Sequence, residues 1–257
     1  MVGKTDNPNF VHGPLGVILF DGNEYSALKL IESRIQSSKK PMHVHLVNAY
    51  TIALAAKDHA LLQLLKSDSA INLIDSFWLS KLISISAKKT VPQCPGPSLF
   101  KVSLENGPDT LRHFLLGGSP AVLNGIRSKL DKLTRRERIL YGSFAPEYQP
   151  LSEMDIDSFV DIVTASGANI VWVGLGTPKQ DFVAFAIATK SHLSALSVGA
   201  AFDFYSGAQK EAPTFLRKVG LEWLFRLISE PRRLWKRYLI GNLVFMREAM
   251  KFLKGSK

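Results

Sequence analysis

Short apolar runs alternate with longer stretches of helical length along most of this chain, and this alternation constrains its fold most. The candidate strands lie at residues 16–20, 43–48, 70–75, 113–116, 138–142, 169–174 and 196–199. The stretches that fit helices include residues 25–37, 49–66, 120–133, 153–165 and 178–190. Such alternation predicts an open, mostly parallel α/β sheet with helices on both faces. Loops are expected at residues 88–97, which hold three prolines, and at 147–152, with Ser152 as a helix N-cap.

The positive charge of the chain is concentrated near its C-terminal end. The 257 residues carry a formal net charge of +10, and from residue 216 onward eleven Lys or Arg face three acids, a net charge of +8. We therefore expect an α/β domain at residues 1–215 and a basic helical appendage at residues 216–257. An excess of positive charge favours an anionic partner, which is a nucleic acid, a phosphate-bearing ligand or an anionic membrane surface.

Composition excludes several classes of protein. A hydrophobic fraction of 46% supplies ample material for a core, so the chain is neither disordered nor fibrous. The single cysteine, Cys94, excludes an internal disulfide and a cysteine-cluster metal site. The first residues lack a basic segment followed by an apolar stretch, so we expect no signal peptide. No apolar run reaches the roughly 18 residues that span a bilayer, and we expect a soluble or peripheral protein in a reducing compartment.

Three of the expected strand-to-helix turns carry residues that suit a ligand. Asp75 ends one strand, Gly117 and Gly118 end another, and the segment GLGTPKQD at residues 174–181 follows a third. Ligands of open parallel sheets bind at the carboxyl ends of strands, where glycines admit close backbone approach and helix N-termini favour phosphate. Two structural alternatives stand beside this interpretation: tight, closely packed glycine turns, and a helix N-cap role for Asp75.

Two pairs of residues have the spacing of metal ligands. Asp155 and Asp157 match the DxD pattern that binds a metal–diphosphate in one class of sugar transferases, but they begin a predicted helix, where acids favour the helix dipole. His43 and His45 share one face of a strand, with no third ligand nearby. We therefore favour structural roles for both pairs.

The basic C-terminal segment is expected to form two helices that separate at Pro231. In the second helix, Arg233 and Arg237 lie four residues apart and share a face. Three amphipathic aromatic residues suit an interface: Trp223, Trp235 and Tyr238. The functional interpretations are a membrane-surface helix and an arginine clamp for phosphates. The structural alternative is a solvated helical end that packs on the core.

Three segments resemble the WecG/TagA/CpsF glycosyltransferases, glycosyltransferase family 26, in the family's order: VWVGLGTPKQDF, SVGAAFDFYSGAQKEAP and GLEWLFRLISEPRRLWKRYL. Four upstream segments also follow that order: HVHLVNAYTIALAAKD, SAINLIDSFWLSKL, PGPSLF and RHFLLGGSPAVL. The likeness runs from about residue 16 to about residue 239, which is nearly the whole chain. The expected fold is therefore a Rossmann-like sheet with a basic helical C-terminal appendage.

The resemblance implies an inverting glycosyltransferase. It would transfer a hexosyl residue (glucose, N-acetylmannosamine or a uronic acid form) from a UDP-sugar to a polyprenyl-diphosphate-linked saccharide in surface polysaccharide biosynthesis. The sequence looks closest to members that act in exopolysaccharide assembly. The resemblance also implies peripheral attachment to the anionic inner face of the cell membrane, with no metal, other cofactor or nucleic acid, and it allows a homo-oligomer.

By the resemblance, Asp75 is the catalytic base. The expected substrate-binding residues are Asn48, Gly117, Gly118, Gly174, Gly176, Pro178, Gln180, Asp181, Asp203, Arg226, Arg232, Arg233 and Arg237. The chain departs from the family's pattern at three places. Asp75 stands in an Ile-Asp-Ser turn instead of Pro-Asp-Gly, Leu46 replaces a threonine, and Asp181 replaces a glutamate.

Two other classes of protein remain open. A nucleotide-cofactor enzyme such as a dehydrogenase would use the GLG turn, but Lys179 stands where its third glycine belongs, and the next strand does not end in an acid. A non-catalytic module that binds nucleic acid or membrane would use the basic appendage. That alternative leaves Asp75 and the glycine turns without a role.

Overall fold

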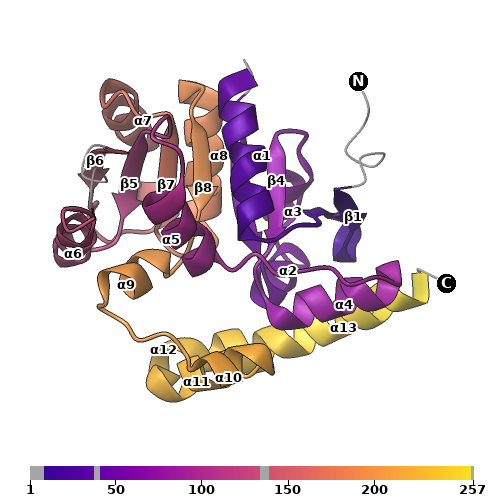
Figure 1. Cartoon of the computed structure of the whole chain (residues 1–257). Coiled ribbons are helices and arrows are strands. Elements are labelled where there is room, and N and C mark those ends of the chain that lie inside the picture. Colours follow the sequence, from indigo (N-terminus) through magenta and orange to yellow (C-terminus); the bar gives the residue numbers. More distant parts are fainter. Residues whose placement is uncertain (1–8, 38–40, 134–138, 256–257) are drawn as a thin grey trace.

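A mostly parallel sheet of eight strands forms the centre of the computed structural model, which describes residues 9–37, 41–133 and 139–255 (Figure 1). The strands are β1 (Phe10–His12), β2 (Ile18–Phe20), β3 (His43–Val47), β4 (Ala70–Ile74), β5 (His113–Gly117), β6 (Leu140–Phe144), β7 (Ile170–Gly174) and β8 (Ser194–Ser197). Their order is β1-β2-β4-β3-β8-β7-β5-β6, with β1 antiparallel to β2 and the other neighbours parallel. The predicted fold class is confirmed.

Helices cover both faces of the sheet. Those preceding the C-terminal segment are α1 (Glu24–Ser37), α2 (Ala49–Ala55), α3 (His59–Lys66), α4 (Phe77–Ala87), α5 (Gly96–Asn106), α6 (Pro120–Leu130), α7 (Ile156–Ala165), α8 (Lys179–Ser191) and α9 (Ala201–Ser206). Alternate residues of each strand supply the two layers of core: Val44 and Leu46 of β3 pack with α1 and α5, whereas Val47 packs with α2 and α3. The sheet is therefore buried on both faces, as its continuous apolar strands predict.

Short polar side chains fix where several helices begin. Asp58 caps α3, and its Oδ1 accepts a hydrogen bond from the backbone N–H of Leu61 at 3.0 Å, so the single helix expected at 49–66 is wrong. Asp155, not the expected Ser152, caps α7 by accepting from the N–H of Ser158 at 3.0 Å. The structural interpretation of Asp155 is therefore confirmed.

The remaining differences are one unpredicted strand and several shifted strand and loop ends. Strand β2 begins at Ile18 and not at the expected residue 16, because Gly16 has a φ of +72°. The three-residue strand β1 was not predicted because it is too short to show a period. Strand β8 ends at Ser197, two residues before the expected end, because Gly199 turns the chain with φ +59°. Strand β6 lies two residues beyond the expected 138–142, whose first residue is outside the described residues. The proline-rich loop ends earlier than expected, since α5 begins at Gly96.

The C-terminal segment, which we define as residues 214–255, lies across the same end of the molecule as α2, α4 and α9 (Figure 1). It consists of α10 (Thr214–Lys218), α11 (Glu222–Ser229), α12 (Pro231–Trp235), a π-helical turn (Lys236–Ile240) and α13 (Gly241–Gly255). The helices separate at Pro231 as predicted, but the expectation of only two helices is wrong, because α10 and α11 both precede this proline. Phe245 of α13 packs in the same apolar cluster as Val47 and Leu79, so this segment covers part of the core.

Candidate functional site

A cleft of about 550 Å³ separates the carboxyl ends of β3 and β4 from the C-terminal segment. Asn48 and Asp75 line it from the sheet side, and Glu222, Arg226 and Arg237 line it from the C-terminal segment. The charged residues that line it are Glu24, Asp75, Glu211, Arg217, Lys218, Glu222, Arg226 and Arg237. This is the position at which open parallel sheets bind ligands.

Two hydrogen bonds hold the Asp75 carboxylate at the sheet side of the cleft. Its Oδ1 accepts from the backbone N–H of Gly96 at 3.0 Å, and its Oδ2 accepts from the Asn48 side-chain amide at 3.1 Å. Ser76, not Asp75, occupies the N-cap position of α4. The N-cap alternative for Asp75 is therefore wrong, and its carboxylate oxygens are oriented at the edge of a cavity.

Asn48 sets this orientation because its own amide is fixed at both ends. Its Oδ1 accepts from the backbone N–H groups of Tyr50 and Thr51, at 3.0 and 3.1 Å, and caps α2. Its Nδ2 is thereby left to face Asp75. Asn48, which was predicted to bind substrate, lines the cleft, but two of its hydrogen-bonding groups are already used within the protein.

Three arginines that line the cleft leave part of their hydrogen-bonding capacity unused. The Nε atoms of Arg217, Arg226 and Arg237 are buried and have no hydrogen-bond partner within the described part of the chain. The Arg237 guanidinium lies 4.7 Å from the ring centre of Tyr50, and that of Arg226 lies 5.5 Å from the ring centre of Phe204. Burial lowers the pKa of Arg237. Arg217 pairs with Glu211 at 2.8 Å, whereas Arg226 and Arg237 make no ion pair with the described residues, so their charges are the ones that an anionic ligand can compensate.

The other basic residues that were predicted for the site lie outside the lining of this cleft. Arg232 and Arg233 are exposed, and Arg233 pairs with Glu230 at 2.9 Å. Asp203, in the first turn of α9, does not line the cleft either, although the next residue, Phe204, does. Burial raises the pKa of Asp203, and the nearby Arg233 charge opposes that rise.

The predicted glycines and Gln180 form a second group, which also lies outside the cleft lining. A Cβ at Gly117 would lie 2.5 Å from the carbonyl oxygen of Gly174, and one at Gly174 would lie 2.8 Å from the Phe202 ring. The Gln180 Oε1 accepts from the backbone N–H groups of Gly176 and Gly199, both at 3.1 Å. Close packing of Gly117 and Gly174, the structural alternative, is therefore confirmed, and Gln180 ties two turns together.

Backbone structure also accounts for the other residues that were predicted at the turns after β5 and β7. Gly118 donates its backbone N–H to the Gly174 carbonyl at 3.2 Å. Pro178 occupies the position just before the first residue of α8, Lys179. A Cβ at Gly176 would meet no atom within 4 Å, and its φ of +79° accounts for the glycine there.

Asp181 belongs to a buried series of hydrogen-bonded side chains that connects α8 to strand β3. Its Oδ1 lies 2.8 Å from His45 Nδ1, and His45 Nε2 lies 2.6 Å from His43 Nδ1. His43 Nε2 in turn lies 2.9 Å from the hydroxyls of both Ser67 and Ser69. The two histidines are core residues, as expected, and Asp181 is buried with them.

Glu222 is a cleft residue that sequence reasoning missed. It opens α11, and burial raises the pKa of its carboxyl group, as does the negative charge of Asp75. In the sequence it is one acid within a basic segment, and nothing local marks it as part of a site. Arg217 was missed for the same reason, because only the folded chain brings it to the cleft.

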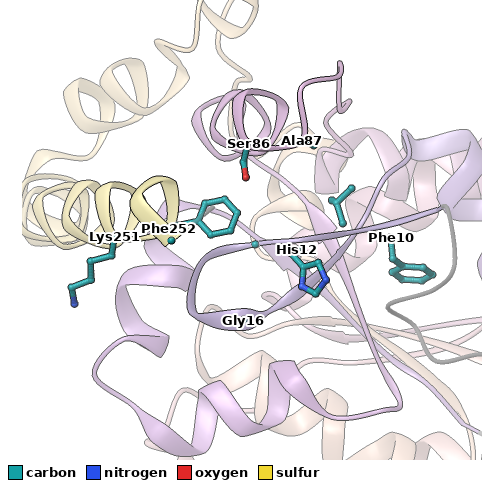
Figure 2. Close-up of a pocket in the computed structure, with 10 residues that line it drawn as sticks. Phe10, His12, Gly16, Ser86, Ala87, Lys251 and Phe252 are labelled. Carbon is teal, nitrogen blue, oxygen red and sulfur yellow. The ribbon is translucent and has the colours of Figure 1, made fainter. Parts of the chain in front are cut away.

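A second cavity, of about 670 Å³, holds none of the predicted site residues (Figure 2). Figure 2 shows it between His12 and Phe10 of β1, Ser86 and Ala87 at the end of α4, and Phe252 of α13. Its lining is mostly apolar and lacks the clustered arginines of the first cavity. The cleft at Asp75 is therefore the candidate active site.

The described residues hold no cluster of metal ligands and no helix that could cross a bilayer. They contain no group of three or more His, Cys, Asp or Glu placed to hold a metal ion, and the DxD residue Asp157 pairs with Lys190. None of the described helices is both long and apolar enough to cross a bilayer.

The chain matches a family of known proteins over most of its length. Residues 14–257 match the model described as the glycosyl transferase WecG/TagA/CpsF family. The match covers nearly the whole chain and confirms the resemblance seen in the sequence. Proteins of this family are glycosyltransferases of surface polysaccharide synthesis, which act on a sugar donor and an acceptor.

Proposed function

The chain belongs to the WecG/TagA/CpsF glycosyltransferase family, and on that premise we propose that it transfers a hexosyl residue, with inversion, from a UDP-sugar to a polyprenyl-diphosphate-linked saccharide. One observation carries the proposal: a fixed carboxylate, Asp75, faces the same cleft as three guanidinium groups with unsatisfied donors. A transferase of this kind needs a base for the acceptor and positive charge for the departing diphosphate.

Asp75 serves as the general base. The acceptor hydroxyl binds within about 2.6–3.2 Å of a carboxylate oxygen and passes its proton to Asp75 as its own oxygen bonds to the anomeric carbon of the donor sugar. The bond from that carbon to the diphosphate breaks on the opposite side, and its electron pair leaves with UDP. The hydrogen bonds from Gly96 and Asn48 hold the carboxylate in place without protonating it.

The arginines stabilise the departing diphosphate. Arg226 and Arg237 approach the cleft from the C-terminal segment, and each has an unused, buried Nε–H. Donors that are already oriented toward developing charge cost little reorganisation during the reaction. We propose that these guanidinium groups, rather than a divalent metal ion, meet the charge of the leaving group.

The outer face of the C-terminal segment contacts the membrane in this proposal. Ten of the sixteen large apolar side chains that are exposed on the described residues lie between Phe215 and Met250, a concentration typical of an interaction surface. Exposed basic residues accompany them: Arg232, Lys236, Arg247, Lys251 and Lys254. Basic and apolar side chains together suit a peripheral contact with an anionic bilayer, where the acceptor's lipid resides.

The deciding experiment measures UDP release with a lipid-linked acceptor across UDP-glucose, UDP-glucuronic acid, UDP-N-acetylmannosamine and its uronic acid form. We expect acceptor-dependent release with one of these donors, and we expect it to persist in EDTA. Release with none of them would contradict the proposed donor class. Activity that EDTA abolishes and Mg²⁺ or Mn²⁺ restores would contradict the arginine mechanism.

A further inference from the structure

Glu222 and Glu24 are the two acids of the cleft lining whose carboxyl groups make no hydrogen bond or ion pair with the described residues. Glu222 is the one that has arginines of the C-terminal segment near it. Asp75, by contrast, accepts two hydrogen bonds, and Glu211 pairs with Arg217 at 2.8 Å. The carboxyl oxygens of Glu222 are therefore available to a ligand. It also lies on the C-terminal segment, across the cleft from Asp75.

The surroundings of Glu222 favour its neutral form. Burial raises the pKa of its carboxyl group most, and the charges of Asp75 and Glu211 raise it further. The guanidinium groups of Arg226 and Arg217 oppose this shift without cancelling it. The other charged residues of the cleft are Glu24, Lys218 and Arg237.

A charge balance shows why the neutral form matters to an anionic ligand. Four acids (Glu24, Asp75, Glu211 and Glu222) and four bases (Arg217, Lys218, Arg226 and Arg237) line the cleft. With all of them ionised, the lining carries no net charge. A proton on Glu222 leaves an excess of one positive charge and turns a repelling carboxylate into an O–H donor.

We propose that Glu222 is a substrate-binding residue that enters the cleft as a neutral carboxylic acid and donates a hydrogen bond to a diphosphate oxygen of the nucleotide. The inference rests on the proposed function and adds a residue and a protonation state to it. Glu222 keeps its proton throughout the transfer, and the proton of the acceptor goes to Asp75. The cleft then binds a diphosphate with one carboxylate ionised as base and another held neutral as donor.

The test compares UDP binding by calorimetry from about pH 5 to about pH 8 in the full chain and its variants. Glu222→Gln keeps a neutral donor at every pH, and Glu211→Gln is the matched control, since Glu211 lines the same cleft but is paired. We expect the Kd of the wild-type protein to rise about tenfold more over this range than that of Glu222→Gln. Ionisation of UDP itself is common to all variants and cancels in the comparison.

A second variant, Glu222→Met, separates the effect of losing the hydrogen-bond donor from the effect of losing the ionisable charge. Glu222→Met also removes the ionisation, so its binding loses the same pH dependence, but it should bind UDP several-fold more weakly than Glu222→Gln because the hydrogen bond is gone. Equal pH dependence in the wild type and in both Glu222 variants would overturn the inference and leave the proposed function standing. A wild-type protein that binds no UDP at any pH would overturn both.

Discussion

Asn48 connects the first turn of α2 to the carboxylate of Asp75. Its Oδ1 accepts from two backbone N–H groups of that turn, and its Nδ2 donates to Asp75 Oδ2 at 3.1 Å. A helix cap therefore also orients the proposed base. Since an amide that caps with its oxygen presents its nitrogen on the other side, Asn48 supplies a hydrogen-bond donor to the Asp75 carboxylate.

Replacement of Asp75 by Asn tests the base directly. The amide retains one oxygen, but its NH₂ group must face a donor, from either Gly96 or Asn48, so we expect a stability loss of about 1–3 kcal/mol. Turnover should fall by about 10²–10⁴, because general-base catalysis is lost. UDP binding should stay within a few-fold of wild type. UDP release on a genuine lipid-linked acceptor measures this, and near-normal activity would show that another residue is the base.

Replacement of Asn48 by Ala tests the connection between cap and base. It removes the cap of α2, worth about 1 kcal/mol, together with the hydrogen bond to Asp75. Asp58→Ala is the matched control, since Asp58 caps α3 and does not line the cleft. We expect both variants to lose free energy of unfolding, measured in urea, with the larger loss in Asn48→Ala, but a fall in kcat of tenfold or more only for Asn48→Ala. Equal kinetics in the two variants would reduce Asn48 to a cap.

Lysine replacements test the arginines inside and outside the cleft. Arg226→Lys and Arg237→Lys keep the charge but lose the planar, stacked guanidinium, so we expect the KM for the UDP-sugar to rise, or kcat to fall, by about tenfold. Arg232→Lys should behave like wild type on a water-soluble acceptor, because Arg232 is exposed and does not line the cleft. Equal losses in all three variants would place the anion site elsewhere.

The sheet side of the candidate site could be predicted from the sequence, because its residues directly follow strands that the local apolar pattern identifies. Asn48 and Asp75 follow neighbouring parallel strands, and register brings the ends of β3 and β4 together, with Val47 opposite Ile74. The C-terminal segment is different, since Arg217 and Glu222 reach the cleft only when the chain folds back across the sheet. No local pattern specifies that return.

The role of the glycine-rich turns could not be predicted from the sequence. A glycine that admits a ligand and a glycine that admits a neighbouring backbone look the same in a sequence. Contact distances separate them here, since Gly117 packs against Gly174, and Gln180 accepts from two N–H groups of nearby turns. Whether 216–257 is a separate unit stays a prediction, although Phe245 shares the core of the sheet domain.

The last prediction concerns the exposed face of α13, a helix that also contributes Phe245 to the core of the sheet domain. Truncation before residue 216 would uncover the cluster around Phe245, so point variants give a cleaner test. Met246 and Met250 lie four residues apart and are 50% and 59% exposed. Replacing both by Gln should weaken co-sedimentation with anionic vesicles by about tenfold, because apolar burial drives interfacial binding. Tyr148→Gln is the control, since Tyr148 is 94% exposed outside this segment.

Lysine variants, and turnover on a soluble and a lipid-linked acceptor, distinguish membrane contact from a role in catalysis. Lys254→Ala should also weaken vesicle binding, and salt should weaken it further, because exposed charges are screened within about 8–10 Å. Lys251→Ala should have a smaller effect, since Lys251 already pairs with Glu248 at 2.9 Å. The methionine and lysine variants of α13 should turn over a water-soluble acceptor at the wild-type rate and a lipid-linked acceptor in vesicles more slowly, whereas Tyr148→Gln should behave like wild type on both acceptors. Equal loss on both acceptors would show that this face supports the cleft and is not a membrane contact.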